Sequence, residues 1–279
     1  MSIELPEALI LARQMNEELV GKVVKSYHLK DCQRLQKTGF VNKDARDFDM
    51  LVGGTIDSVT SKGNSMLVKL DNGTNLMLAP EYGGVVLYHA DGSKVPSSYH
   101  LRMDFADRTS LTVRLTGMGC LNSVPDRKLK HNYVYRRDFL GRPSPIGEEF
   151  TFESFSRKLG ISNRMLKSCL VGKDAVVTGL GNSLFQEIAY KAKIHPKAKA
   201  SELDEGRKRA LYGAVREVVQ SRIKKGGKDD FVDLHGKRGR HEPSMGSHMK
   251  GRACPVCGTA IDSMSIAGGP SYFCPSCQR

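Results

Sequence analysis

CPVCGTAIDSMSIAGGPSYFCPSC, residues 254–277, is the stretch that most narrowly restricts the fold of this sequence. It holds four of the seven cysteines, Cys254, Cys257, Cys274 and Cys277, at the spacing C-x2-C-x16-C-x2-C. Each C-x2-C pair can present two thiolates from one tight turn, and Zn²⁺ prefers four such ligands in tetrahedral geometry. Two disulfides are the alternative, but nothing in the sequence indicates secretion, so we expect one structural zinc ion.

The residues between the two cysteine pairs predict a hairpin. Ile261 and residues 271–273 have the character of two short strands, and Gly268-Gly269-Pro270 separates them. This pattern is typical of a zinc ribbon. The other three cysteines stand singly along the chain, and we expect them to be small core residues.

The segment before the ribbon, residues 226–252, is glycine-rich, basic and weakly patterned. Such composition predicts a linker or a mobile loop. A cluster of positive charges in and just before this segment has two interpretations, a solvated flexible loop or direct contact with phosphates. They are Lys224, Lys225, Lys228, Lys237, Arg238 and Arg240.

Further upstream, residues 138–147 are loop-like, and helical periodicity begins at Phe152. Phe152, Phe155 and Leu159 recur at the spacing of one helix face, and a further helix begins at Asn182. Residues 201–204, Ser-Glu-Leu-Asp, fit a capping box that opens a long helix, which Gly226-Gly227 then ends.

The stretch Val177-Thr178-Gly179-Leu180-Gly181-Asn182 lies directly before one of these helices. Backbone N–H groups at a helix N-terminus, with an amide side chain at the expected N-cap Asn182, suit a phosphate oxygen. Gly179, Gly181 and Asn182 are therefore candidate nucleic-acid ligands, and Lys167 belongs to their basic surroundings. The alternative is a tight helix–helix turn capped by Asn182.

The first half of the chain predicts β structure after one helix at residues 7–15, with Pro6 at its first turn. Short strand-like runs follow at even spacing, separated by turn signals such as Asp71-Asn72-Gly73. Such a series indicates a β-sandwich or barrel. The expected strands are 22–29, 55–59, 65–70, 75–79, 84–88, 100–105 and 110–115.

The composition excludes several classes of protein. The 279 residues carry 43 Lys+Arg against 30 Asp+Glu, a net charge of +13, which favours a polyanionic partner. Charge alone does not separate DNA from RNA or a membrane surface. There is no apolar run near the ~18 residues of a spanning helix, and no signal peptide is apparent. We therefore expect an intracellular protein, cytoplasmic or nucleoid-associated, with no membrane partner.

Together, these motifs resemble the formamidopyrimidine-DNA glycosylase/endonuclease VIII family over nearly the full length of the chain. The residues that carry the resemblance are Glu4-Leu5-Pro6-Glu7, residues 178–183, Ala192-Lys193-Ile194-His195-Pro196, Asp230-Phe231-Val232-Asp233 and the cysteine ribbon. None of these motifs is unique, but their order and spacing together are highly specific.

The resemblance implies an α+β, multidomain architecture. Its parts are an N-terminal β-sandwich (1–136), a helix–two-turn–helix module (137–225), and a basic loop with a C-terminal zinc finger (226–279). The implied partner is double-stranded DNA, damaged or abasic, held in a cleft between domains by a monomer.

The resemblance also implies catalytic residues. Family enzymes attack C1′ of the damaged nucleotide with the amine of an N-terminal proline and form a Schiff base, while the next glutamate transfers protons. Here Ile3 stands at the proline position and one residue is added before it. The candidates are therefore the amine of Ser2, exposed by removal of Met1, with Glu4 as acid/base and Glu7 bordering the site.

Other family positions differ as well. A lysine of the family's β-hairpin aligns with Asn64, so Lys62 is the candidate to replace it. The family's three void-filling residues fall at Tyr82 and within Gly117-Met118-Gly119-Cys120-Leu121, and Tyr82 is the candidate to insert into the base stack. The zinc-finger arginine that grips phosphates aligns with Gly269.

These differences leave three hypotheses. The first is a base-excision-repair protein that recognises damaged, abasic or distorted duplex DNA, with glycosylase or abasic-site lyase activity through an N-terminal amine. The second is a catalytically inactive homologue that only binds damaged DNA. The third is a module that binds RNA or another partner.

Overall fold

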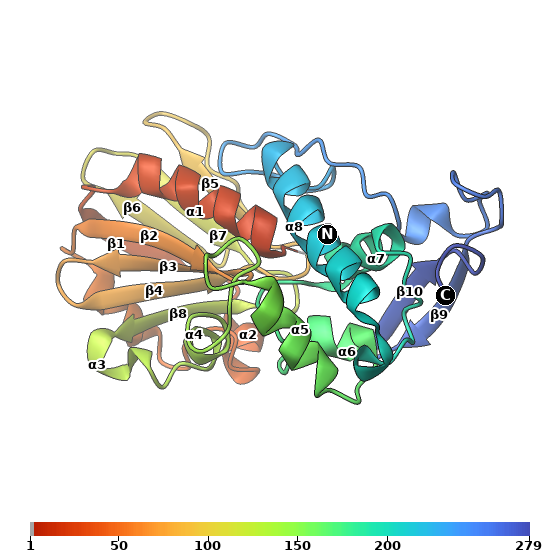
Figure 1. Ribbon diagram of the computed structural model, residues 1–279. Coiled ribbons are helices and arrows are strands. Elements are labelled where there is room, and N and C mark those ends of the chain that lie inside the picture. Colours follow the sequence, from red (N-terminus) through yellow and green to blue (C-terminus); the bar gives the residue numbers. More distant parts are fainter. Residues whose placement is uncertain (1–2) are drawn as a thin grey trace. The chain divides into compact units, whose positions relative to one another are not determined.

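The computed structural model describes residues 3–279 (Figure 1), so Met1 and Ser2 lie outside the described residues. The described chain forms two compact units. One runs to Gly141 and adds Lys225–Arg240, and the other consists of Arg142–Lys224 and His241–Arg279. The sequence predicts domain boundaries after residues 136 and 225. These boundaries stay a prediction.

The first unit is a β-sandwich, as expected. Within the described residues its strands form two antiparallel sheets, ordered β1-β6-β7-β5 and β2-β3-β4-β8. Each of the seven expected strands overlaps an observed one. The strands are β1 (Val24–Leu29), β2 (Ile56–Lys62), β3 (Ser65–Leu70), β4 (Thr74–Ala79), β5 (Val85–His89), β6 (Leu101–Phe105), β7 (Ser110–Arg114) and β8 (Cys120–Pro125).

The strand β8 is not among the sequence expectations. Glycines at 117 and 119 interrupt the apolar alternation just before it, so the run lacks the pattern of a strand. This strand forms because it pairs antiparallel with β4 along its whole length, from Ala79 opposite Cys120 to Thr74 opposite Pro125.

The core of this unit joins both sheets and the helix α1 (Leu5–Leu19). Leu11, Met15 and Leu19 are fully buried, and α1 packs mainly against β2. The helix extends beyond the expected 7–15 at both ends. Pro6 is accommodated near its N-terminus, where the missing N–H has no intrahelical acceptor to lose.

Every residue of β4 is buried, because both of its faces are covered. Leu76 and Leu78 point into the main core, whereas Met77 and Ala79 pack on the other face with the helix α4 (Tyr133–Asp138). Short helical segments complete this unit. They are α2 (Gln33–Lys37), η1 (Ala45–Leu51) and α3 (Asp126–Leu129).

Residues 225–240 are an integral part of the first unit, so the prediction of a linker or mobile loop is wrong for them. Phe231 and Leu234 are fully buried in its core. Gln14 of α1 donates to Asp233 at 2.9 Å and accepts from the Leu234 N–H at 3.0 Å. Gln14 lies more than two hundred residues before Asp233 and Leu234 in the sequence. The local composition of residues 225–240 therefore does not reveal these contacts.

The second unit contains the expected helices. They are α5 (Phe152–Gly160), α6 (Leu166–Leu170), α7 (Asn182–Lys191) and α8 (Glu205–Lys224), with η2 (Ala200–Glu202) and η3 (Ser247–Met249). Phe150, Phe155 and Tyr212 stack together where α5 meets α8. The capping box expected at residues 201–204 is wrong. Instead, Asp204 caps α8, accepting from the Arg207 N–H at 2.8 Å.

The same unit ends in the expected ribbon. β9 (Asp262–Ile266) and β10 (Gly269–Phe273) pair antiparallel in continuous register. Ala267 and Gly268 connect them with φ of 47° and 81°, as a two-residue hairpin turn requires. Within residues 3–279, no helix is both long and apolar enough to span a bilayer.

Candidate functional site

The four ribbon cysteines converge in the second unit. Their Sγ atoms all lie within 4.8 Å of one another, with Cys254 and Cys277 3.9 Å apart and Cys257 and Cys274 3.4 Å apart. Tetrahedral zinc with Zn–S bonds of about 2.3 Å places its sulfurs about 3.8 Å apart. A disulfide requires about 2.05 Å. The cluster therefore fits one structural zinc ion, which confirms the sequence prediction over the two-disulfide alternative.

The surroundings of Cys254 favour a thiolate. Burial raises the pKa of its thiol, but hydrogen bonds from the Tyr190 hydroxyl and from the backbone N–H groups of Val256 and Cys257 outweigh it and bring the pKa to about 6. The Tyr190 hydroxyl lies 3.2 Å from Cys254 Sγ. A helix of this unit thus supports the metal centre from outside the ribbon.

Lys167 of α6 is buried against the same ribbon. Its ammonium group donates to the carbonyl oxygens of Ile266 and Gly269, at 2.9 and 3.1 Å, and to the hydroxyl of Ser271 at 3.1 Å. The side chain is 2% exposed, and burial lowers its pKa. These three bonds use all three donors of the ammonium group. The expected contact of Lys167 with DNA is therefore corrected to a structural role in holding the hairpin.

The glycine motif before α7 has the geometry of a helix entry. Gly179 has φ of +80°, which side chains rarely adopt, whereas Gly181 is extended and occupies the N-cap position. Asn182 is therefore the first helical residue, one position later than expected. Its Nδ2 donates to Pro270 O at 3.0 Å and, within the described residues, keeps its second N–H for another acceptor.

The first unit places the two candidate carboxylates at the N-terminus of α1. Glu4 is the N-cap residue and is 2% exposed. Glu7, fully buried, accepts from the Glu4 N–H and from the Lys228 N–H, each at 3.1 Å. The two glutamates form a capping box, because the Glu4 side chain in turn accepts from the Glu7 N–H. Both carboxylates thus hold the start of the helix, and Glu4 stays the acid/base candidate through its place next to the N-terminus. Ser2, the proposed source of the amine, lies outside the described residues.

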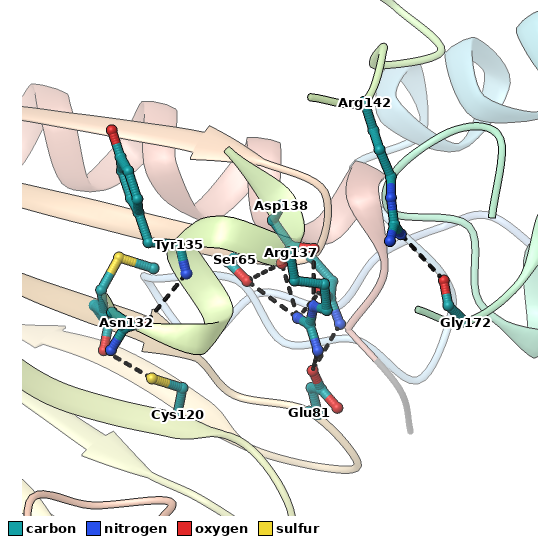
Figure 2. Close-up of polar contacts among 11 residues, drawn as sticks. Ser65, Glu81, Cys120, Asn132, Tyr135, Arg137, Asp138, Arg142 and Gly172 are labelled. Carbon is teal, nitrogen blue, oxygen red and sulfur yellow. Dashed lines mark hydrogen bonds and ion pairs between the residues drawn. The ribbon is translucent and has the colours of Figure 1, made fainter. Parts of the chain in front are cut away.

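Lys62 and Asn64 lie at the turn between β2 and β3. The ammonium nitrogen of Lys62 is 3.5 Å from the carbonyl oxygen of Phe139, at the limit of a hydrogen bond. Asn64 is held much more firmly, because it donates to Glu81 at 3.0 Å and accepts from Arg137 at 2.8 Å. Asn64 thus belongs to a network of charges, whose other members Figure 2 shows.

Tyr82 follows β4 on the loop 80–84 and is 56% exposed. Met118, which belongs to the stretch 117–121 aligned with the family's void-filling residues but is not itself a sequence candidate, is also exposed, at 48%. The two loops pack backbone against backbone, since a Cβ on Gly119 would lie 2.5 Å from Ala79 O and 3.5 Å from Glu81 N. Glycines on both sides of Met118 were the available sign of a tight, exposed turn.

Models of three protein-family domains match successive parts of this chain. The formamidopyrimidine-DNA glycosylase N-terminal domain matches residues 3–116, and the formamidopyrimidine-DNA glycosylase H2TH domain matches residues 140–231. The zinc finger found in FPG and IleRS matches residues 251–279. These are the β-sandwich, the helical module and the four-cysteine ribbon already described.

The chain belongs to the formamidopyrimidine-DNA glycosylase/endonuclease VIII family.

Similar proteins extend this family match to the whole chain. The formamidopyrimidine-DNA glycosylase of Desulforamulus reducens is 28% identical over 286 residues, and that of Streptococcus mutans is 25% identical over 283 residues. Each alignment covers 99% of both proteins.

Among solved structures, the Lactococcus lactis Fpg (MutM) in complex with DNA containing N7-benzyl-Fapy-dG has a TM-score of 0.86 at 25% identity, covering 99% of both chains. The Lactococcus lactis Fpg in complex with abasic-site DNA has a TM-score of 0.86 at 24% identity, again covering 99% of both chains. At 24% identity, the similarity to this abasic-site complex shows a shared fold only.

Within this family, the chain keeps the glutamates but not the proline position. Ile3, which precedes Glu4, is 1% exposed and belongs to the hydrophobic core of the first unit.

Proposed function

We propose that this protein binds duplex DNA at an abasic or otherwise damaged nucleotide and acts there in base-excision repair, as a glycosylase and abasic-site lyase. The nucleophile is the N-terminal amine, exposed on Ser2 after removal of Met1. It attacks the C1′ aldehyde of the opened sugar, and loss of water gives a Schiff base. Glu4 supplies and removes the protons of these steps.

The observation that carries this proposal is the position of Glu4. This carboxylate is 2% exposed at the start of α1 and stands two residues after Ser2 in the sequence. Glu7 borders this site and has a structural role, because two backbone N–H groups donate to it. An ordinary N-terminal amine has a pKa of about 7.7–8.0, so roughly a tenth to a sixth of it is unprotonated and nucleophilic at pH 7.

We assign phosphate contacts to residues of both units. Asn182, with Gly179 and Gly181 before it, supplies an amide and the N-terminus of a helix, which favour an anion. Lys62 supplies a weakly held ammonium group. In this proposal the protein acts as a monomer in the nucleoid.

Two exposed apolar side chains are assigned to the unstacked base pair. Tyr82 and Met118 come from adjacent loops, and side chains of this kind can fill the space that an extruded nucleotide leaves. Because abasic sites are already unstacked, the protein should prefer them to intact duplex.

Borohydride trapping on an abasic duplex tests the enzymatic function, combined with mass spectrometry of the protein N-terminus. We expect chains that begin at Ser2 to form a covalent adduct with DNA. Chains that retain Met1, whose amine lies one residue further away, should form little. Absence of an adduct with correctly processed protein would exclude covalent catalysis.

A second candidate function is damaged-DNA binding without catalysis. It is favoured by Ile3 at the proline position and by Asn64, which is held in a network of charges where the resemblance expects a lysine. Glu4→Gln separates the two functions. It should abolish trapping while leaving abasic-duplex binding intact, whereas a pure binder gives no trapping with either form.

RNA is the remaining alternative partner. Competition between structured RNA and abasic duplex tests it directly. The proposed function requires the abasic duplex to displace RNA at equal nucleotide concentration, and preferential retention of RNA would contradict it.

A further inference from the structure

A network of buried charges lies beside the loop that carries Tyr82. Arg137, on α4, donates from Nη1 to Glu81 Oε1 at 3.0 Å and from Nη2 to Asn64 Oδ1 at 2.8 Å. It also pairs with the neighbouring Asp138 through Nε and Nη2, at 2.9 and 2.8 Å. Ser65 donates to the same carboxylate, and Figure 2 shows the arrangement.

The network is well shielded from water. The side chains of Arg137, Glu81 and Asp138 are 20%, 15% and 4% exposed. The carboxylates of Glu81 and Asp138 raise the pKa of Arg137 against the opposing effect of burial, so the guanidinium stays charged. The planar fork of arginine lets one side chain bind three others at fixed angles.

The network joins three segments of the first unit that are distant in sequence. Asn64 belongs to the β2–β3 turn, Glu81 to the loop after β4, and Arg137 to α4. Asn64 also donates directly to Glu81 at 3.0 Å, which closes a triangle of contacts. A movement of any one segment would break bonds to the other two.

Tyr82 directly follows Glu81, one of the three residues joined by these contacts. Its backbone has φ of +52°, a conformation uncommon for an aromatic residue, and its side chain is 56% exposed. The loop is also closely packed at Gly84, where a Cβ would lie 2.5 Å from Pro80 Cβ. Strained conformations persist only where the surrounding structure holds them.

We propose that Arg137 is a positioning residue for DNA unstacking. Through Glu81 it holds Tyr82 in an exposed, rigid orientation, and through Asn64 it fixes the hairpin of Lys62 relative to Tyr82. The role of Arg137 in unstacking DNA rests on the proposed function. The positioning itself is a property of the free protein and is measurable without DNA.

The free protein is tested with a fluorescent reporter at position 82. The sequence contains no tryptophan, so Tyr82→Trp introduces a single indole. In that background, Arg137→Met should lower the fluorescence anisotropy and increase quenching by acrylamide. Unchanged values in a folded Arg137→Met protein would overturn the proposal. If Arg137→Met does not fold, Glu81→Gln, which removes one charge from the network, is read in the same way.

The matched control is Arg102→Met. Arg102 pairs with Asp104 at 2.7 Å on β6 of the other sheet, and its side chain is 34% exposed. This substitution should leave the anisotropy at position 82 unchanged. An equal fall with both substitutions would indicate general loosening and would also overturn the proposal.

The DNA test is a double-mutant cycle on the ratio of affinities for abasic and intact duplex. Tyr82→Ala should reduce this ratio about 5- to 100-fold, the contribution of one base–aromatic stack. Arg137→Met should reduce it similarly, and adding it to Tyr82→Ala should reduce it no further. Additive losses would overturn positioning. A wild-type ratio of one would instead refute the proposed function, while the fluorescence result still decides the role of Arg137.

Discussion

The ammonium group of Lys167 lies 3.1 Å from the carbonyl oxygen of Gly269, a contact that fastens α6 to the zinc hairpin. At the position of Gly269 the family resemblance expects a phosphate-gripping arginine. Here the hairpin offers a backbone carbonyl to a buried lysine instead. A basic residue that the sequence assigns to DNA is therefore part of the scaffold that holds the ribbon beside the N-terminus of α7.

Lys167→Met should destabilise the second unit without removing a phosphate contact. Carbonyl groups of Ile266 and Gly269 lose their donor, and each buried unsatisfied group costs about 1–3 kcal/mol. We expect a lower thermal unfolding midpoint. The slope of log K against log salt for duplex DNA should not change. A shallower slope would show that Lys167 neutralises a phosphate after all.

Lys62→Met is the counterpart of that experiment. The ammonium group of Lys62 makes only a weak hydrogen bond to the carbonyl oxygen of Phe139, so the substitution should change the stability of the protein little. If Lys62 contacts one phosphate, the salt slope should become shallower by about 0.9. Titration of DNA binding at several salt concentrations measures this, and an unaltered slope would remove Lys62 from the interface.

Removal of zinc should unfold the ribbon selectively. Without the metal the four sulfur–zinc bonds that join the two C-x2-C turns are lost, and the small core of the ribbon must hold it alone. Metal analysis should find one zinc ion per chain. Chelation, or Cys257→Ser, should lower the unfolding midpoint and weaken DNA binding. A metal-free protein with unchanged stability would contradict a structural role.

Phe231→Ala should destabilise the first unit, although Phe231 follows the helices in sequence. The ring is fully buried, and truncation of such a side chain costs about 3–5 kcal/mol. Val232→Ala is the matched control, because Val232 is only partly buried and should cost far less. Urea unfolding measures both. Equal small effects would mean that residues 225–240 are dispensable for folding.

The stability of the first unit should fall in weak acid because of His100. Its Nδ1 accepts from the Leu115 N–H at 2.9 Å, and burial, aided by Arg114, lowers the pKa of His100 below 6.5. The unfolded chain then binds the proton more readily. The stabilisation is complete above pH 6.5 and is lost as pH falls through the lower, folded pKa.

His100→Asn should weaken this pH dependence. Asparagine keeps an acceptor near the position of Nδ1 and does not titrate. His89, whose pKa burial also lowers, still contributes in the variant. Unfolding midpoints at pH 8 and pH 5 provide the measurement. An identical pH dependence in both proteins would show that His100 is not responsible.

Elements that depend on local patterns are predictable from this sequence, whereas contacts between distant residues are not. The strands β3 and β7 and the helix α7 were placed within a residue or so, because apolar alternation and helical periodicity are local patterns. The helix α4 was missed, since its six residues carry too little periodicity to detect. The exposure of Met118 is not predictable from the sequence, because it results from the packing of one loop on another.

The sequence by itself determined the zinc ligands, the order of sheet, helices and ribbon, and the family. Each of these depends on spacing within a short stretch, which a turn or a helix converts directly into geometry. The tertiary structure alone decided that Lys167 is buried, that residues 225–240 belong to the first unit, and that Arg137 joins Asn64 to Glu81. Those contacts join residues 56 to 220 positions apart, and burial and pairing at that range arise only when the whole unit has folded.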